Sequence, residues 1–175
     1  MRASRAARWE ARHDLSTSRL SWLRPACSRR CRRNFVALVF DGRLDCLISN
    51  GPSPNGLVLS PDEAVLFVAM TRDNSIWRVP LMRDGGVGKV GRFSLFFGIS
   101  GPDGLTMDQK GRLFVAHASL GHVFVMAPNG ETIARIKSCA GATCTNLVLE
   151  SANGTLLITE SSTGSVLMAD LAHFP

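Results

Sequence analysis

The sequence predicts an all-β fold, a β-propeller of about three blades that follows a basic, irregular N-terminal tail. Residues 34–175 consist of short apolar runs separated by Gly, Pro, Asn and Asp, which is typical of strands joined by tight turns. A motif of Asn or Asp before an apolar strand returns after 48 and then 43 residues. A period in the forties with about four short strands per unit indicates propeller blades. Strands at this density also fit a β-sandwich, but the regular restart favours the propeller.

The individual strands are expected where β-branched and aromatic residues form runs between turn residues. No helix of normal length is expected in this part of the chain. The first two runs flank Asp-Gly-Arg and predict a hairpin, and the later runs fall into three units that each begin with the recurrent motif. The expected strands are residues 35–40, 44–49, 56–60, 65–70, 75–81, 90–98, 104–108, 112–117, 122–128, 132–137, 146–150, 155–160 and 165–171.

The first 33 residues differ from the rest in charge. They contain ten Arg against two acidic residues, whereas residues 34–175 contain ten basic and twelve acidic residues. The pI near 9.6 therefore belongs to the tail, and the body is mildly acidic. We interpret residues 1–33 as disordered or non-native sequence. The alternatives are a transit-like peptide and a basic arm for RNA or an acidic surface.

Length, hydropathy and cysteine count limit the setting and the partners. A chain of 175 residues allows one domain besides the tail. Neither a signal peptide nor an apolar run of about 20 residues is present, so we expect a cytoplasmic protein without a membrane partner. Nucleic acid is not expected as a partner because the positive charge is confined to the tail. The odd count of five cysteines favours free thiols, with a Cys139–Cys144 disulfide as the alternative.

A polar residue opens each repeat: Asn55, Asp103 and Asn146. The first strand of a blade lines the central channel, and blades are related by rotation, so these side chains are expected to converge near the axis. Two amide oxygens and one carboxylate suit a hard cation such as Ca²⁺ or Mg²⁺. The alternative is that each side chain only satisfies nearby backbone groups in an Asx-turn.

Three phrases carry a resemblance to a known family. PNGLVLSPDEAVLFVAM, GPDGLTMDQKGRLFVAHASLGHVFVMAPNGE and TNLVLESANGTLLITESSTGSVLMADL resemble, in order, the regucalcin/gluconolactonase (senescence-marker-protein-like) family. Its members are six-bladed β-propellers that hydrolyse lactones with one divalent metal ion. Over residues 34–175 the resemblance implies that Asn55 and Asp103 are metal ligands and that Asp103 also serves in base catalysis. It further implies that Asn146 lines the pocket.

The resemblance also implies a cofactor and a substrate. The metal is expected to be Ca²⁺, with Zn²⁺, Mg²⁺ and Mn²⁺ as alternatives, and the substrate a small-molecule lactone. In a complete site, the resemblance implies that the metal would polarise the lactone carbonyl and that Asp103 would help to deprotonate the attacking water. His117 and His122 belong to the second and third strands of their blade, so they are expected to pack or to lie at the surface rather than to catalyse.

The matched part resembles the C-terminal half of the family. We therefore expect the chain to lack the metal-binding glutamate of the family's first blade, which puts the activity of this chain in doubt. The alternative function is a non-catalytic propeller fragment that acts as a binding or oligomerisation module, because the open edges of a partial ring favour self-association. A nucleic-acid binder that acts through the basic arm is the third hypothesis.

Overall fold

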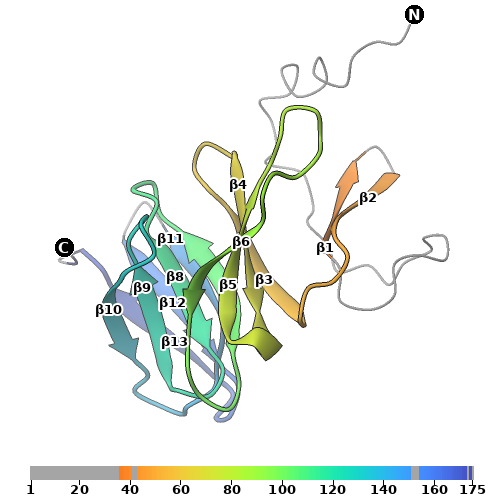
Figure 1. The fold of residues 1–175 in the computed structure, drawn as a ribbon. Helices are drawn as coiled ribbons and strands as arrows, with labels where there is room; N and C mark the ends of the chain where they lie inside the picture. Colours follow the sequence, from red (N-terminus) through yellow and green to blue (C-terminus); the bar gives the residue numbers. More distant parts are fainter. Residues whose placement is uncertain (1–35, 41–42, 151–153, 173, 175) are drawn as a thin grey trace, which may run out of the picture.

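The computed structural model describes residues 36–40, 43–150, 154–172 and 174. Thirteen described strands form four antiparallel sheets that follow one another along the chain (Figure 1). The expected all-β fold is confirmed, and the helix described is a single 3₁₀ turn, η3 (Thr71–Asp73). No helix in this part of the chain is both long and apolar enough to cross a membrane.

The sheets are a two-stranded hairpin and three larger units, which we name blades 1, 2 and 3. The hairpin is β1–β2, blade 1 is β3–β6, blade 2 is β7–β10 and blade 3 is β11–β13, each in sequential order. The strands are β1 (Val36–Phe40), β2 (Arg43–Ile48), β3 (Pro54–Leu59), β4 (Val65–Met70), β5 (Ser75–Pro80), β6 (Gly91–Leu95), β7 (Pro102–Met107), β8 (Leu113–His117), β9 (His122–Met126), β10 (Thr132–Lys137), β11 (Cys144–Glu150), β12 (Thr155–Glu160) and β13 (Ser165–Asp170).

The first strands of the three blades lie against one another. Strand β7 contacts β3 on one side and β11 on the other, and the remaining strands of each blade extend away from this line (Figure 1). First strands that meet while later strands diverge are the arrangement of propeller blades around an axis. The expected partial propeller of about three blades is therefore confirmed.

Apolar residues fill the space between consecutive sheets in three clusters. The hairpin packs on blade 1 through Val36 and Ile48, which meet residues such as Leu66 and Val68. Between blades 1 and 2 lie Phe67, Ala69, Ile76, Leu105, Leu113, Val115, Phe124 and Met126. Between blades 2 and 3 lie Phe114, Ala116, Val123, Val125, Cys144, Leu147, Leu156 and Ile158.

Strand β8 shows how one run of residues supplies two of these clusters. Side chains alternate between the faces of a strand, so Leu113 and Val115 point to blade 1 while Phe114 and Ala116 point to blade 3. All five residues of β8 are buried. The second strand of a middle blade is therefore apolar throughout rather than alternating, as is usual for a strand covered on both faces.

Two sequence predictions are tested only in part, or not at all, by the described residues. The interpretation of residues 1–33 as a separate tail lies outside the described residues. Within them, Cys46 and Cys139 are exposed and Cys144 is buried. Cys139 and Cys144 are not joined by a disulfide, so the favoured prediction of free thiols agrees with the structure at these two positions.

Candidate active site

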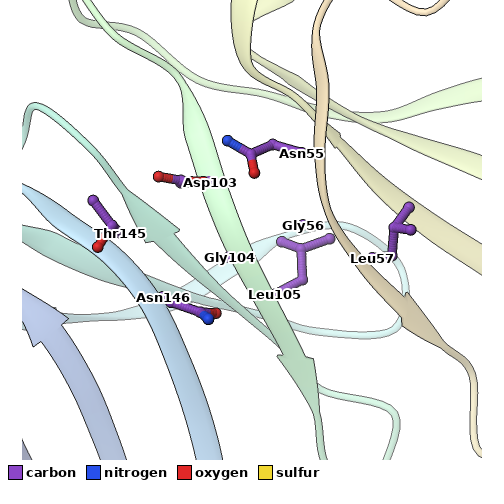
Figure 2. A pocket seen from close by; sticks show the side chains of 8 residues that line it. All are labelled: Asn55, Gly56, Leu57, Asp103, Gly104, Leu105, Thr145 and Asn146. Carbon is purple, nitrogen blue, oxygen red and sulfur yellow. The ribbon is translucent and has the colours of Figure 1, made fainter. Parts of the chain in front are cut away.

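An open pocket of about 390 Å³ lies where the first strands of the three blades meet (Figure 2). It is lined by Asn55, Gly56, Leu57, Asp103, Gly104, Leu105, Thr145 and Asn146. Corresponding segments of β3, β7 and β11 supply all eight residues, so the sequence repeat places its recurrent polar motif at a single location.

The motif lies inside the strands and not at their start, which corrects the strand limits expected from the sequence. In β3, Pro54 pairs with Met70 and Leu57 with Val68, so Asn55 and Gly56 together face one residue of β4. The same irregularity interrupts the pairing of β7 with β8 and of β11 with β12. A bulge of two residues against one bends the strand and redirects a side chain. Each blade therefore turns one polar side chain out of its sheet at the same level.

The glycines of the motif let the strands approach closely. A Cβ atom on Gly56 would lie 2.2 Å from the carbonyl oxygen of Asp103, and one on Gly104 would lie 2.7 Å from Cα of Asn146. Only glycine allows such an approach of backbone to backbone. The Asn-Gly and Asp-Gly pairs, which usually mark hairpin turns, here combine an outward polar side chain with contact between neighbouring blades.

Asn55 is oriented by a threonine that the sequence analysis did not select. Asn55 Nδ2 donates to Oγ1 of Thr71 (3.4 Å), and this hydroxyl donates to the carbonyl oxygen of Pro102 (2.9 Å). Thr71 thus links blade 1 to the residue directly before Asp103. With its nitrogen engaged, the amide leaves its Oδ1 to accept from, or coordinate, a ligand in the pocket.

Asp103 is half-buried, and its carboxylate has neither a hydrogen bond nor an ion pair to another described residue. Burial raises the pKa of its carboxyl group, because the charged form loses hydration without gaining a partner. In Figure 2 the Asn55 side chain extends toward β7, and the Asp103 side chain extends from β7 toward β11. Asp103 is therefore a carboxylate that lacks a compensating charge in this part of the chain and faces an open pocket.

In the third repeat, strand pairing matches a different residue with Asn55 and Asp103 than the sequence repeat does. Cys144 pairs with Glu160 as Pro54 pairs with Met70, so Thr145, one residue later, is the counterpart of Asn55 and Asp103. Its hydroxyl contacts Oγ1 of Thr159 (3.0 Å). The sequence repeat does not single out Thr145, because it matches Asn146 with Asn55 by residue type and the polar hydroxyl is the only local signal of Thr145.

Asn146, which the sequence repeat matches with Asn55 and Asp103, occupies the position of Gly56 and Gly104. It lines the pocket, but its Oδ1 accepts from the backbone N–H of Leu147 (2.9 Å). Its backbone N–H in turn donates to Oγ1 of Thr159 (2.9 Å). The Asn146 side chain is therefore partly occupied by local backbone contacts, in the manner of the Asx alternative.

His117 and His122 are not among the residues that line this pocket. His117 is fully buried and contacts Oδ1 of Asn74 through Nε2 (3.2 Å), with its ring against Phe96 and Phe124. Burial, with a smaller contribution from His122, lowers the pKa of His117 to about 4. His117 is a neutral core residue at neutral pH, which agrees with the expectation that it packs rather than catalyses.

Comparisons with known proteins support the fold and identify the family. Residues 28–162 match the family model described as SMP-30/Gluconolactonase/LRE-like region. The chain belongs to this family. Its fold is a partial β-propeller of the regucalcin/gluconolactonase type, as the sequence predicted.

Relatives in the SMP-30/gluconolactonase family match this chain over only part of their own length. The chain is 34% identical over 130 residues to a gluconolactonase of Zymomonas mobilis, which covers 69% of this chain and 36% of that protein. The structure of a calcium-binding regucalcin from Agrobacterium tumefaciens superposes with a TM-score of 0.67 at 25% identity, covering 77% of this chain and 51% of that one. A gluconolactonase structure from Xanthomonas campestris gives 0.61 at 27% identity, covering 71% and 40%. The chain therefore spans about half or less of the relatives that it matches.

Proposed function

We propose that this chain carries part of the catalytic pocket of a lactone hydrolase of the gluconolactonase type. The observation that carries the proposal is Asp103, a half-buried carboxylate without a partner among the described residues, in an open pocket beside Asn55. Relatives named gluconolactonase or lactonase support the substrate class. A small cyclic ester is also of a size that a pocket of about 390 Å³ accepts.

The chemistry assigned to this chain is base catalysis. Asp103 takes a proton from water as the water oxygen bonds to the lactone carbonyl carbon, and a raised pKa makes the ionised carboxylate a stronger base. When the ring C–O bond breaks, the proton passes to the leaving alkoxide, and the product is an open-chain hydroxy acid. Asn55 and Thr145 line the same pocket, and in this proposal Asn55 Oδ1 and the Thr145 hydroxyl orient polar groups of the substrate or the water.

The residues present fit a divalent cation by donor type. Asp103 and Asn55 offer oxygen atoms, the ligands that Ca²⁺ and Mg²⁺ prefer, and a cation would relieve the buried charge of Asp103. The solved relative named as calcium-binding supports Ca²⁺ first, with Mg²⁺, Mn²⁺ and Zn²⁺ as alternatives. A bound ion would supply Lewis-acid polarisation of the carbonyl.

A second candidate function is a propeller fragment that binds ligand without turnover. The observation in its favour is that Asp103 is the one acidic residue among the described residues that line the pocket. Across the described residues no group of three or more His, Cys, Asp or Glu is arranged to hold a metal ion. One carboxylate gives a weak cation site unless further oxygen ligands join it.

Two readouts on the same variants separate these functions. Proton release from glucono-δ-lactone measures hydrolysis, and calorimetric titration with Ca²⁺, Mg²⁺, Mn²⁺ or Zn²⁺ measures binding of the metal alone. We expect Asp103→Asn to abolish both, and the exposed control Asp45→Asn to change neither. Metal binding without hydrolysis by the unmodified chain would favour the binding module. Hydrolysis that Asp103→Asn leaves unchanged would refute the assigned role.

A further inference from the structure

The segment that joins blade 1 to blade 2 exposes three large apolar side chains. Leu95, Phe97 and Ile99 occupy alternate positions in it and are 61%, 58% and 104% exposed. The segment runs from the end of β6 into β7, so a described blade lies on each side of it. Its exposure is therefore not that of a sheet at either end of the described part. We name these three residues the apolar loop.

Hydrogen bonds hold the backbone of the apolar loop in place. The Phe96 N–H donates to the carbonyl oxygen of Asn74 (2.6 Å), and Nδ2 of Asn74 donates to the carbonyl oxygen of Gly98 (2.9 Å). The Phe96 ring packs between the blades against the Phe124 ring, with 5.1 Å between centroids. The loop is therefore fixed while its apolar side chains point outward. Exposed apolar residues that gather in one place mark a contact with another molecule or a membrane.

Strand β10 of blade 2 places cationic side chains beside the apolar loop. The guanidinium group of Arg135 lies over the Phe97 ring, 5.8 Å from its centroid. Lys137, two residues further along β10, is exposed on the same face of the strand. Aromatic and cationic side chains thus occur together on this side of the loop.

The turn η3 of blade 1 adds a cation on the other side. Arg72 is exposed and lies two residues before Asn74, which anchors the apolar loop. Asp73, the acidic residue between them, forms an ion pair with Arg92 (3.1 Å). The negative charge of Asp73 is thus compensated locally, and the side chains around the loop favour an anionic partner.

We propose that the apolar loop binds the surface of an anionic lipid membrane. Aliphatic and aromatic side chains enter the boundary between headgroups and acyl chains, while Lys and Arg remain at the anionic headgroups. A protein partner would need a surface that complements all three side chains. A fluid bilayer accepts protruding side chains such as Ile99 without a matching shape. The contact is peripheral, it would revise the expectation of no membrane partner, and it does not depend on lactone hydrolysis.

Flotation of the 175-residue chain with lipid vesicles tests the proposal. The vesicles contain either phosphatidylcholine alone or phosphatidylcholine mixed with phosphatidylglycerol. We expect binding to the anionic vesicles, with a partition coefficient that Phe97→Ser/Ile99→Ser lowers by roughly tenfold or more. Lys137→Ala should lower it about fivefold. The matched control is Met82→Ser, at an apolar residue that is 49% exposed after the opposite end of β5, and it should change nothing.

The ten Arg of residues 1–33 also attract anionic lipid, so all variants are compared in chains that keep this tail. Binding that Phe97→Ser/Ile99→Ser leaves unchanged, and that removal of residues 1–33 abolishes, assigns the contact to the tail and overturns the proposal. Absence of vesicle binding overturns it, as does an equal loss with Met82→Ser. Equal binding to both kinds of vesicle overturns the choice of an anionic surface.

Two further controls separate the lipid contact from other causes. Self-association that Phe97→Ser/Ile99→Ser abolishes, in a chain that binds no vesicles, would assign the apolar loop to a second copy and overturn the proposal. If the double variant lowers the unfolding midpoint, Ile99→Ser alone is used. Its side chain is fully exposed, so the same direction of change is expected at an unchanged midpoint.

Discussion

The close approach of the first strands can be tested by adding a single methyl group. In Gly56→Ala the new Cβ would lie 2.2 Å from the carbonyl oxygen of Asp103, whereas ordinary contact begins at 3.4 Å. The neighbouring atoms are backbone, so they cannot move aside as a side-chain tip would. Blades 1 and 2 must separate locally by about 1 Å, and overpacking of this kind costs about 1–3 kcal/mol.

The expected loss is visible in thermal unfolding followed by circular dichroism. For a chain of this size about 1 kcal/mol shifts the midpoint by roughly 2–4 °C, so Gly56→Ala should lower it by roughly 2–12 °C. Gly104→Ala should act in the same direction, because its Cβ would lie 2.7 Å from Cα of Asn146. The double variant tests whether the two contacts are coupled.

Gly91→Ala is the matched control. Gly91 is also a strand residue, but its added Cβ meets no atom within 4 Å. Replacing glycine by alanine where the backbone tolerates it stabilises a protein by about 0.4–1 kcal/mol through the unfolded state. Gly91→Ala should therefore leave the midpoint unchanged or raise it slightly. If Gly56→Ala and Gly91→Ala unfold at the same temperature, the close approach does not constrain the fold and our explanation of the Asn-Gly motif fails.

Three further perturbations follow from buried polar groups. Burial lowers the pKa of His117 from 6.5 to about 4, so the free energy of unfolding should fall by up to about 3 kcal/mol as the pH drops from 6.5 to 4. His117→Gln should flatten this pH dependence. Denaturant titrations of the unmodified chain that show no such loss contradict the prediction. Hydrogen bonds from Ser162 and then Thr163 lower the pKa of Glu160 from 4.5 to about 2. Its contribution is therefore present above 4.5 and lost toward 2, so Glu160→Gln should reduce the melting temperature at neutral pH. Thr71→Val removes the hydroxyl that donates to the Pro102 carbonyl and should lower the free energy of unfolding by about 1–3 kcal/mol in denaturant titrations. An unchanged midpoint would show that this hydrogen bond is dispensable.

The strands could be predicted from the sequence because their signals are local. Runs such as VLFVAM and RLFVAH combine β-branched and aromatic residues between turn residues, and every expected strand is present. Their order and period were sufficient to indicate blades. The apolar content of β8 is visible in the sequence as well, although its burial on both faces follows only from the neighbouring blades.

The details of the pocket could not be predicted because they depend on pairing between distant segments. Asn-Gly has a strong local meaning as a turn, which placed Asn55 at the start of a strand. The bulge that moves it inside β3 becomes visible only when Pro54 and Leu57 are matched to β4. In the same way, the pairing of Cys144 with Glu160 brings Thr145 and not Asn146 into the position of Asp103. The contact of Thr71 with Pro102 joins two blades and has no sequence signature.

The packing of consecutive sheets affects how the molecule opens. Each apolar cluster joins one sheet to the next along the chain, so stability is approximately a sum of terms between nearest neighbours, as in a linear array of repeats. Among the described sheets, the hairpin and blade 3 each pack on one neighbour, so opening is expected to begin there and to reach the middle last. The amide protons of β8, which is buried on both faces, should exchange with solvent most slowly, whereas those of β2 and β13 should exchange early. Exchange rates would therefore form a gradient across the ribbon in Figure 1, from both ends toward blade 2.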